Sequence, residues 1–169
     1  MLFRSLATFS GVEQQVMTND LLSAMTAQMT TAGMAEMAAW VGKEARAQAP
    51  GYFDGSPITV APNPATVADH VEMIVRDSSG AEIQRMALPV SAEPIEWAGV
   101  TTDGAPLPNG IYAFEVVSYD ADGGVILQEP ADVYSTVIEV RSVSGEAVLI
   151  LEGGVAVPAA SVSALRDPL

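Results

Sequence analysis

Asp120 and Asp122 form the pattern in this chain that is closest to a metal site. They stand in the stretch Asp-Ala-Asp-Gly, and carboxylates at this spacing before a glycine open many calcium-binding loops. The twelfth position of such a loop is a glutamate that binds the ion through both oxygens, whereas here it is Ala131. Because Asp-Gly is also a strong hairpin signal, the sequence predicts a β-turn here, with no metal and no cofactor.

His70 is the single histidine of the chain and the other side chain suited to chemistry. Imidazole titrates near neutral pH and can serve as a general base, and Asp69 stands beside it. A serine hydrolase would also need a nucleophile on a sharp turn, but the pattern GxSxG does not occur. Neither glycine-rich phosphate loop, GxxxxGKS/T or GxGxxG, occurs either. The sequence therefore predicts a surface histidine and a protein that is not an enzyme.

The charge of the chain excludes two classes of partner. It carries 21 acidic and 7 basic residues, a net charge of −14 at pH 7, which repels nucleic acid phosphates and anionic membrane surfaces. No segment approaches the roughly 20 apolar residues that span a bilayer. The first ten residues lack a small-residue cleavage site, so we expect no cleaved signal peptide. The absence of cysteine excludes disulfides and thiolate metal sites.

Residues 10–40 carry apolar side chains at helical intervals. Ser10 and Glu13 form a capping-box pattern at the start, and Gly33 predicts a break before a second, short helix over residues 34–40. Five of the eight methionines lie in this region, and methionine adapts to irregular or changing surfaces. Such a face either packs on the rest of the chain or meets another copy, and both readings stay open. The self-association hypothesis rests on one stripe: Leu21, Leu22, Met25 and Met29.

The rest of the chain alternates with the period of a β-strand. Residues 71–76 and 81–86 predict a hairpin, with Asp-Ser-Ser-Gly at 77–80 as its turn. Proline-bearing stretches at 61–64 and 128–131 cannot lie in a central strand. They therefore predict the two boundaries of a β-sandwich.

A second β block consists of a strand that ends at Trp97, a turn-rich loop and a further strand after the turn Leu107-Pro108. In the strand that follows, alternate side chains share one face. A tyrosine just after such a turn, opposite a buried tryptophan, is typical of the corner that joins the two sheets of an immunoglobulin-like sandwich. The sequence therefore predicts a structural core that contains Trp97, Tyr112, Phe114 and Val116.

Three segments of the chain resemble, in the same order, the flagellar hook-capping protein family (FlgD, also called basal-body rod modification protein). Leu6 to Leu22, LATFSGVEQQVMTNDLL, is similar to the family's helical motif, and Trp40 to Glu44, WVGKE, to the start of its first strand. Trp97 to Gly123, with LPNGIYAFEV and DADG, resembles its fibronectin-type domain. The family's leader rich in proline and asparagine has no counterpart in Met1 to Ser5, which predicts either a truncated start or a short member.

The resemblance implies a mainly β fold with a helical N-terminus, in which a fibronectin type III or immunoglobulin-like β-sandwich is inserted in a small Tudor-like β-barrel. The expected domains are a helical assembly and export segment at residues 1–40, a barrel from the two flanks at 41–61 plus 131–165, and a sandwich at 62–130.

The resemblance also implies a function. It predicts a non-enzymatic assembly factor that caps the distal end of the growing hook as a homo-oligomer and guides hook protein polymerisation. Its partners would be the hook protein, further copies of itself and the flagellar type III export apparatus, which would carry it from the cytoplasm to the extracellular hook tip. The alternative is an immunoglobulin-like binding module of a bacterial surface or secreted protein, with a carbohydrate or protein ligand. The helical start and the few aromatic residues favour the assembly factor.

Overall fold

The structure, a computed structural model, describes residues 18, 20–22, 24, 25 and 33–168. Positions 18, 20–22, 24, 25 and 33–37 are α-helical. No helix within the described ranges combines the length and the apolar character needed to cross a bilayer. The remaining elements are β1 (Glu44–Ala47), β2 (Gly51–Phe53), β3 (Ile58–Ala61), β4 (His70–Arg76), β5 (Glu82–Leu88), β6 (Ile95–Trp97), β7 (Gly110–Tyr119), β8 (Val125–Pro130), β9 (Asp132–Val143), β10 (Glu146–Leu151), β11 (Ala156–Pro158), β12 (Ala164–Arg166), and the 3-10 helices η1 (Ala38–Trp40), η2 (Glu152–Gly154) and η3 (Ala159–Ser161).

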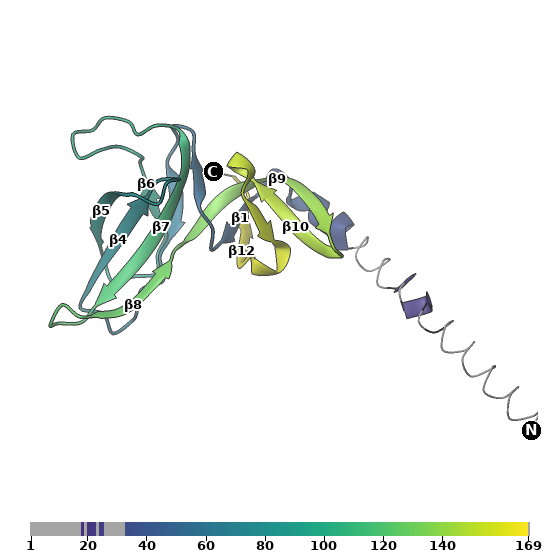
Figure 1. Cartoon of the computed structure of the whole chain (residues 1–169), viewed down its shortest axis with the longest axis horizontal. Coiled ribbons are helices and arrows are strands. Elements are labelled where there is room, and N and C mark those ends of the chain that lie inside the picture. Colours follow the sequence, from purple (N-terminus) through teal and green to yellow (C-terminus); the bar gives the residue numbers. More distant parts are fainter. Residues whose placement is uncertain (1–17, 19, 23, 26–32, 169) are drawn as a thin grey trace, which may run out of the picture.

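Two β lobes lie side by side, and β9 runs from one into the other (Figure 1). In the first lobe, β7 is the central strand of a five-stranded sheet. β4 pairs along one edge of β7 and carries β5 on its far side. β2 and β8 pair with the other edge, β2 along residues 110–112 and β8 along residues 115–119. The predicted hairpin of residues 71–76 and 81–86 is confirmed as β4 and β5.

The turn between β4 and β5 shows how a short sequence fixes the register. The Asp77 carboxylate accepts hydrogen bonds from the backbone N–H groups of Ser79 and Ala81, at 2.9 and 3.1 Å. Gly80 adopts a positive φ of 85°, a conformation that costs glycine little. Aspartate followed by glycine therefore holds the turn by local chemistry alone.

The other sheet has seven strands and reaches into both lobes, and two of them close the sandwich: β3 pairs with β6 and, at its end, with β9. The facing sides of the two sheets bury one apolar cluster. Its members are Phe53, Ile58, Val60, Val71, Met73, Val75, Trp97, Tyr112, Phe114, Val116, Ala131 and Val133.

The second lobe is a curled half-barrel with the strand order β11, β10, β9, β1, β12. Ser144 and Gly145, with φ of 52° and 84°, make the tight turn between β9 and β10. Within the described residues β11 and β12 do not pair, so the expected barrel is an open half-barrel. Met37 and Trp40, at the end of the helical region, pack against its core. That core consists of Ala45, Ala47, Val137, Leu149, Leu151, Val157 and Ala159.

The packing divides the first flank, residues 41–61, between the lobes. Ala45 belongs to the half-barrel core, whereas Phe53 and Val60 belong to the sandwich core. The proline-bearing stretch at 61–64, which suggested a boundary, begins the loop between β3 and β4 within the sandwich. The assignment of domains at 1–40, 41–61 plus 131–165, and 62–130 stays a prediction.

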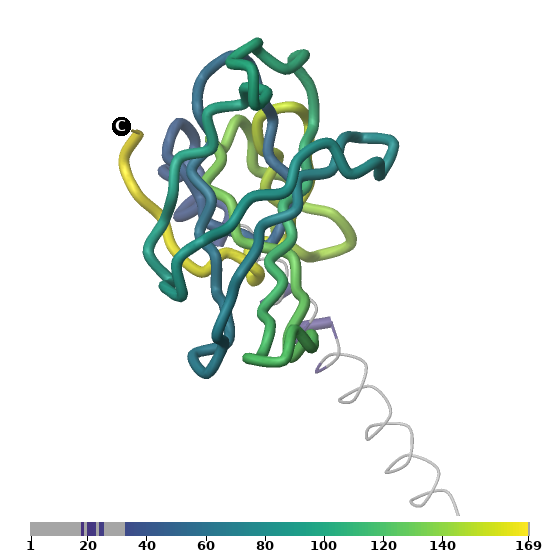
Figure 2. The backbone as a smooth tube through the Cα atoms, turned by 90° about the vertical axis from the view of Figure 1, so that its left-hand side faces the viewer, coloured from purple at the N-terminus to yellow at the C-terminus, as the bar shows by residue number. Residues whose placement is uncertain are grey.

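The C-terminal strand returns to the beginning of the β region. β12 pairs antiparallel with β1, so that Glu44 lies opposite Arg166. In the view of Figure 2 the yellow C-terminal segment accordingly runs beside the purple and blue start of the β region. The half-barrel is thus built from both ends of the described β chain, with the sandwich strands between them.

Candidate functional site

Asp120 lies in the turn between β7 and β8, as the hairpin prediction required. Its carboxylate accepts hydrogen bonds from the backbone N–H groups of Asp122 and Gly124, at 2.9 and 2.8 Å. Gly123 adopts a positive φ of 83°, which completes the turn. Ala131, at the position of the missing calcium ligand, is buried in the sandwich core. In the part of the chain that the structure describes, no three acidic or histidine side chains gather in a way that could hold a metal.

We expect calcium to leave the stability of the protein unchanged, because the Asp120 carboxylate already holds the turn through backbone N–H groups. The melting temperature should be the same in calcium and in chelator, both for the unmodified chain and for the variant Asp120→Asn with Asp122→Asn. Asp122→Asn alone is the matched control. The backbone N–H of Asp122 donates to Asp120 in the turn, and this variant keeps that hydrogen bond. A rise in melting temperature with calcium in the unmodified chain would contradict the turn assignment.

His70 stands at the start of β4 with half of its side chain exposed. Its Nε2 atom lies 3.2 Å from Oε1 of Glu72, whose other oxygen accepts a hydrogen bond from Arg85 at 2.7 Å. The Arg85 hydrogen bond, followed by that of His70, lowers the pKa of the Glu72 carboxyl. Tyr119 completes the group, donating its hydroxyl to Glu72 at 3.1 Å. These contacts tie β4, β5 and β7 together at the surface and offer no nucleophile to a reaction.

The sandwich core is organised around Trp97, which is 2% exposed. Its ring centroid lies 5.4 Å from that of Phe53 and 5.1 Å from those of Tyr112 and Phe114. The indole N–H donates to Oε1 of Gln84 at 2.9 Å, so its one polar group is satisfied. Val116, the fourth residue of the predicted core, is buried in the same cluster.

Tyr112 forms the corner that joins the sheets. Its hydroxyl donates to the backbone carbonyl of Pro108 at 2.6 Å, four residues upstream. A tyrosine hydroxyl that bonds back to the nearby backbone is the hallmark of the tyrosine corner in immunoglobulin-like sandwiches. Burial, and then the negative charge of Asp77, raises the pKa of the Tyr112 hydroxyl.

Arg166 of β12 joins the two lobes through side-chain contacts. Its Nε donates to Glu44 of β1 at 2.7 Å, its Nη2 donates to the hydroxyl of Thr59 of β3 at 2.9 Å, and its guanidinium lies 3.9 Å from the ring centroid of Tyr134 of β9. Thr59 in turn donates to Glu96 of β6 at 2.6 Å. Sequence inspection missed this network, because its members are distant in the chain and no local pattern connects them.

Gly153 of η2 lies close to two side chains of the sandwich. It has a φ of 79°, and a Cβ atom there would lie 2.7 Å from Cδ1 of Ile111 and 2.8 Å from Cβ of Tyr52. Both neighbours belong to the sandwich, in β7 and β2. The sequence does not predict this close approach, because Ile111 and Tyr52 are distant from Gly153 in the chain.

The basic side chains that the structure describes are already paired. Each of them forms an ion pair with a carboxylate of the same chain: Lys43, Arg46, Arg76, Arg85, Arg141 and Arg166. Because acidic residues outnumber basic ones by 21 to 7, many carboxylates remain without a basic partner. The described surface thus favours partners that carry positive charge.

The stripe proposed for self-association lies partly within the described residues. Leu21, Leu22 and Met25 are in helical positions and are 63%, 55% and 52% exposed. Met29 lies outside the described residues, as does most of the expected helix break at 30–33. No observation in the structure tests self-association, which stays a prediction.

The chain is similar to known proteins in sequence and in structure. The family model of the FlgD Ig-like domain matches residues 47–122. The crystal structure of FlgD from Xanthomonas campestris, described in terms of hook capping essential for flagellar assembly, is 25% identical, with a TM-score of 0.62 over 80% of this chain and 99% of that one. FlgD from P. aeruginosa shares the fold, with 21% identity and a TM-score of 0.59 over 73% of this chain and 96% of that one. No curated protein sequence matches the chain. With this domain and this fold, the resemblance of the chain to the FlgD hook-capping protein family is confirmed.

Proposed function

We propose that this protein is a non-enzymatic scaffold that caps the distal end of the growing flagellar hook and guides the polymerisation of hook protein. The observation that carries the proposal is the combined match of domain and fold. The FlgD Ig-like domain matches residues 47–122, and the match to the Xanthomonas campestris FlgD structure covers 80% of the chain. That relative is described by its role in hook capping, and we extend the role to this chain.

The polar side chains that could have done chemistry make structural contacts, which supports a scaffold. Asp120 serves a turn, and His70 and Glu72 link strands at the surface. The alternative of a carbohydrate-binding module would need aromatic rings exposed for stacking against a sugar. Trp97, the largest aromatic side chain of the sandwich, is buried in the core, which favours the scaffold.

We place the protein at the extracellular tip of the hook, delivered there by the flagellar export apparatus. Its partners there would be the hook protein and further copies of itself. The acidic surface would keep such a subunit soluble at high local concentration. Within the cap, we assign self-association to the helical region, on the evidence of the exposed Leu21 and Met25.

A strain that lacks this chain should therefore make no hooks and release unpolymerised hook protein. The unmodified chain should restore hooks, and the double variant Leu21→Glu with Met25→Glu should not, because charges on the apolar helical face prevent its burial. Val67→Glu is the matched control, since this valine is 83% exposed in the loop between β3 and β4.

Light scattering and thermal melting of the purified proteins should distinguish an assembly defect from a folding defect. Light scattering should show an oligomer for the unmodified chain and for the control, and a monomer for the double variant, with equal melting temperatures. A chain that begins at Gly33 should also be a folded monomer, because it keeps Met37 and Trp40 on the half-barrel core. An oligomer that survives this truncation would move the interface to the β lobes.

A further inference from the structure

Asn109 and Gly110 are neighbours in the chain that can react with each other without an enzyme. The backbone nitrogen of the second residue can attack the side-chain amide carbon of the first, which closes a five-membered ring. Any side chain on the second residue would hinder this approach, and glycine has none. Asparagine is accordingly one of the thermolabile residues of proteins. The dipeptide is therefore a candidate site of covalent modification.

The structure leaves both reacting residues accessible to water. Asn109 is exposed in the segment between β6 and β7, and its side chain forms no hydrogen bond with any described residue. Nothing lies within 4 Å of the position that a Cβ atom would occupy on Gly110. Both residues line a surface hollow of about 370 Å³. Gly110 pairs with Phe53 at the very end of the ladder between β7 and β2, and strand ends open more easily than strand centres.

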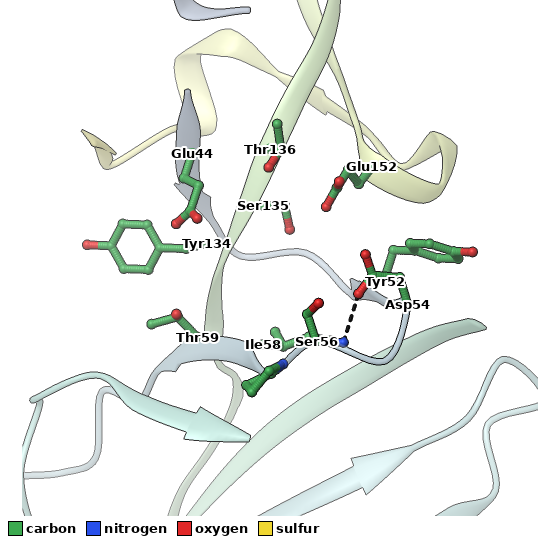
Figure 3. A pocket seen from close by; sticks show the side chains of 11 residues that line it. Glu44, Tyr52, Asp54, Ser56, Ile58, Thr59, Tyr134, Ser135, Thr136 and Glu152 are labelled. Atoms are coloured by element: carbon green, nitrogen blue, oxygen red, sulfur yellow. Dashed lines mark hydrogen bonds between the residues drawn. The ribbon is translucent and has the colours of Figure 1, made fainter. Parts of the chain in front are cut away.

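Two comparable positions show what protects a side chain from this reaction. Asn63 is also exposed, but the nitrogen that follows it belongs to Pro64 and carries no proton to lose. Asp54 also precedes a glycine, but its carboxylate accepts a hydrogen bond from the backbone N–H of Ser56 at 2.9 Å, the dashed line in Figure 3. This hydrogen bond lowers the pKa of the Asp54 carboxyl, and an ionised carboxylate resists attack. Neither protection exists at the turn before β7.

We propose that Asn109 deamidates spontaneously and that the reaction loosens the tyrosine corner of the sandwich. The Gly110 nitrogen loses its proton and bonds to Cγ of Asn109, the bond from Cγ to Nδ2 breaks, and the amide nitrogen leaves as ammonia. One water molecule then opens the ring. Opening at one carbonyl yields aspartate, and opening at the other yields isoaspartate, in which the backbone runs through the former side chain and is longer by one carbon. The inference does not depend on the role in hook capping.

Both products affect the corner hydrogen bond from the Tyr112 hydroxyl to the Pro108 carbonyl. This bond is 2.6 Å long and closes a loop of the chain that includes residue 109. Isoaspartate adds one backbone atom inside the loop, so the donor and the acceptor no longer fit. Aspartate instead adds a negative charge to the hollow that Asp77 also lines, and like charges repel. The modified chain should therefore be less stable at the start of β7.

The test is peptide mapping by mass spectrometry of the full-length chain during prolonged incubation in mildly alkaline buffer. We expect the peptide that contains Asn109 to gain the mass difference between an amide and an acid, as a mixture of aspartate and isoaspartate. The peptide that contains Asn63 is the internal control and should keep its amide. The variant Asn109→Gln should keep its amide as well, because glutamine must close a six-membered ring, which forms far more slowly.

Thermal melting tests the effect on the corner. The deamidated protein carries one more negative charge, so anion exchange separates it from the unmodified protein. We expect it to melt at a lower temperature. The same modification in the variant Tyr112→Phe should lower the melting temperature less, because this variant already lacks the corner hydrogen bond.

Two results would overturn the proposal. The first is that Asn109 keeps its amide in the folded chain while a free peptide of the sequence LPNGI loses it under the same conditions, which would show that the fold protects the site. The second is an equal loss of melting temperature in the unmodified chain and in Tyr112→Phe, which would show that the corner is not affected. Neither experiment measures hook formation, so their failure leaves the capping role untouched.

Discussion

Trp97→Ala should lower the stability of the protein more than any other single truncation in the sandwich. Trp97 is 2% exposed and contacts three other rings, so its removal leaves a large cavity in the core. Truncating a buried aromatic residue costs about 3–5 kcal/mol, a large share of the ~5–15 kcal/mol by which a native domain is stable. Chemical denaturation followed by circular dichroism should show a much lower free energy of unfolding.

Tyr112→Phe is the matched control for this experiment. It keeps the ring in the same cluster and removes only the hydrogen bond from the hydroxyl to the Pro108 carbonyl. We expect a loss of about 1 kcal/mol, as for a typical hydrogen bond. Equal stability of Trp97→Ala and the unmodified chain would show that the tryptophan does not hold the core together.

Gly99→Ala should be the most damaging change of a glycine. Gly99 adopts a φ of 68°, and a Cβ atom there would lie 2.2 Å from Cε2 and 2.3 Å from Cζ of Phe53. The ring is itself buried and packed against Trp97, so any movement of the ring disturbs the core. Backbone strain and overpacking together should cost about 2–5 kcal/mol in the free energy of unfolding.

The variant Gly80→Ala separates the cost of backbone strain from the cost of overpacking. Gly80 has a similar φ of 85°, but nothing lies within 4 Å of the position that a Cβ would occupy. This variant should therefore lose only the ~1 kcal/mol of backbone strain. Equal losses for Gly80→Ala and Gly99→Ala would mean that Phe53 moves aside easily and that the core near β6 is loosely packed.

The local features of the fold are those that the sequence predicts well. The hairpins at residues 77–80 and 120–124 follow from aspartate and glycine at fixed positions, where the side chain and the backbone of a few neighbouring residues decide the conformation. The mainly β architecture with an immunoglobulin-like sandwich is confirmed, as is the resemblance to the hook-capping family.

The relations between the lobes could not be predicted in the same way. Phe53 and Ala45 lie in one short flank of the sequence, yet one enters the sandwich core and the other the half-barrel core. The partners that decide this, such as Tyr112 opposite Gly51, come from distant parts of the chain.

The pairing of β1 with β12 has a consequence for the order in which the protein folds. The sandwich has its strands complete once Val133 has been synthesised, whereas β1 must wait for a partner strand that ends at Arg166. In a chain that grows from its N-terminus the strands of the sandwich are therefore made before β12, so the sandwich can fold first and the half-barrel acquires its last strand later. Pairing between residues so far apart in the chain is also slow, because the ends of a long loop must first meet. Until then, the outer edge of β1 exposes unpaired backbone groups, and this nascent form is the one most open to pairing with other chains.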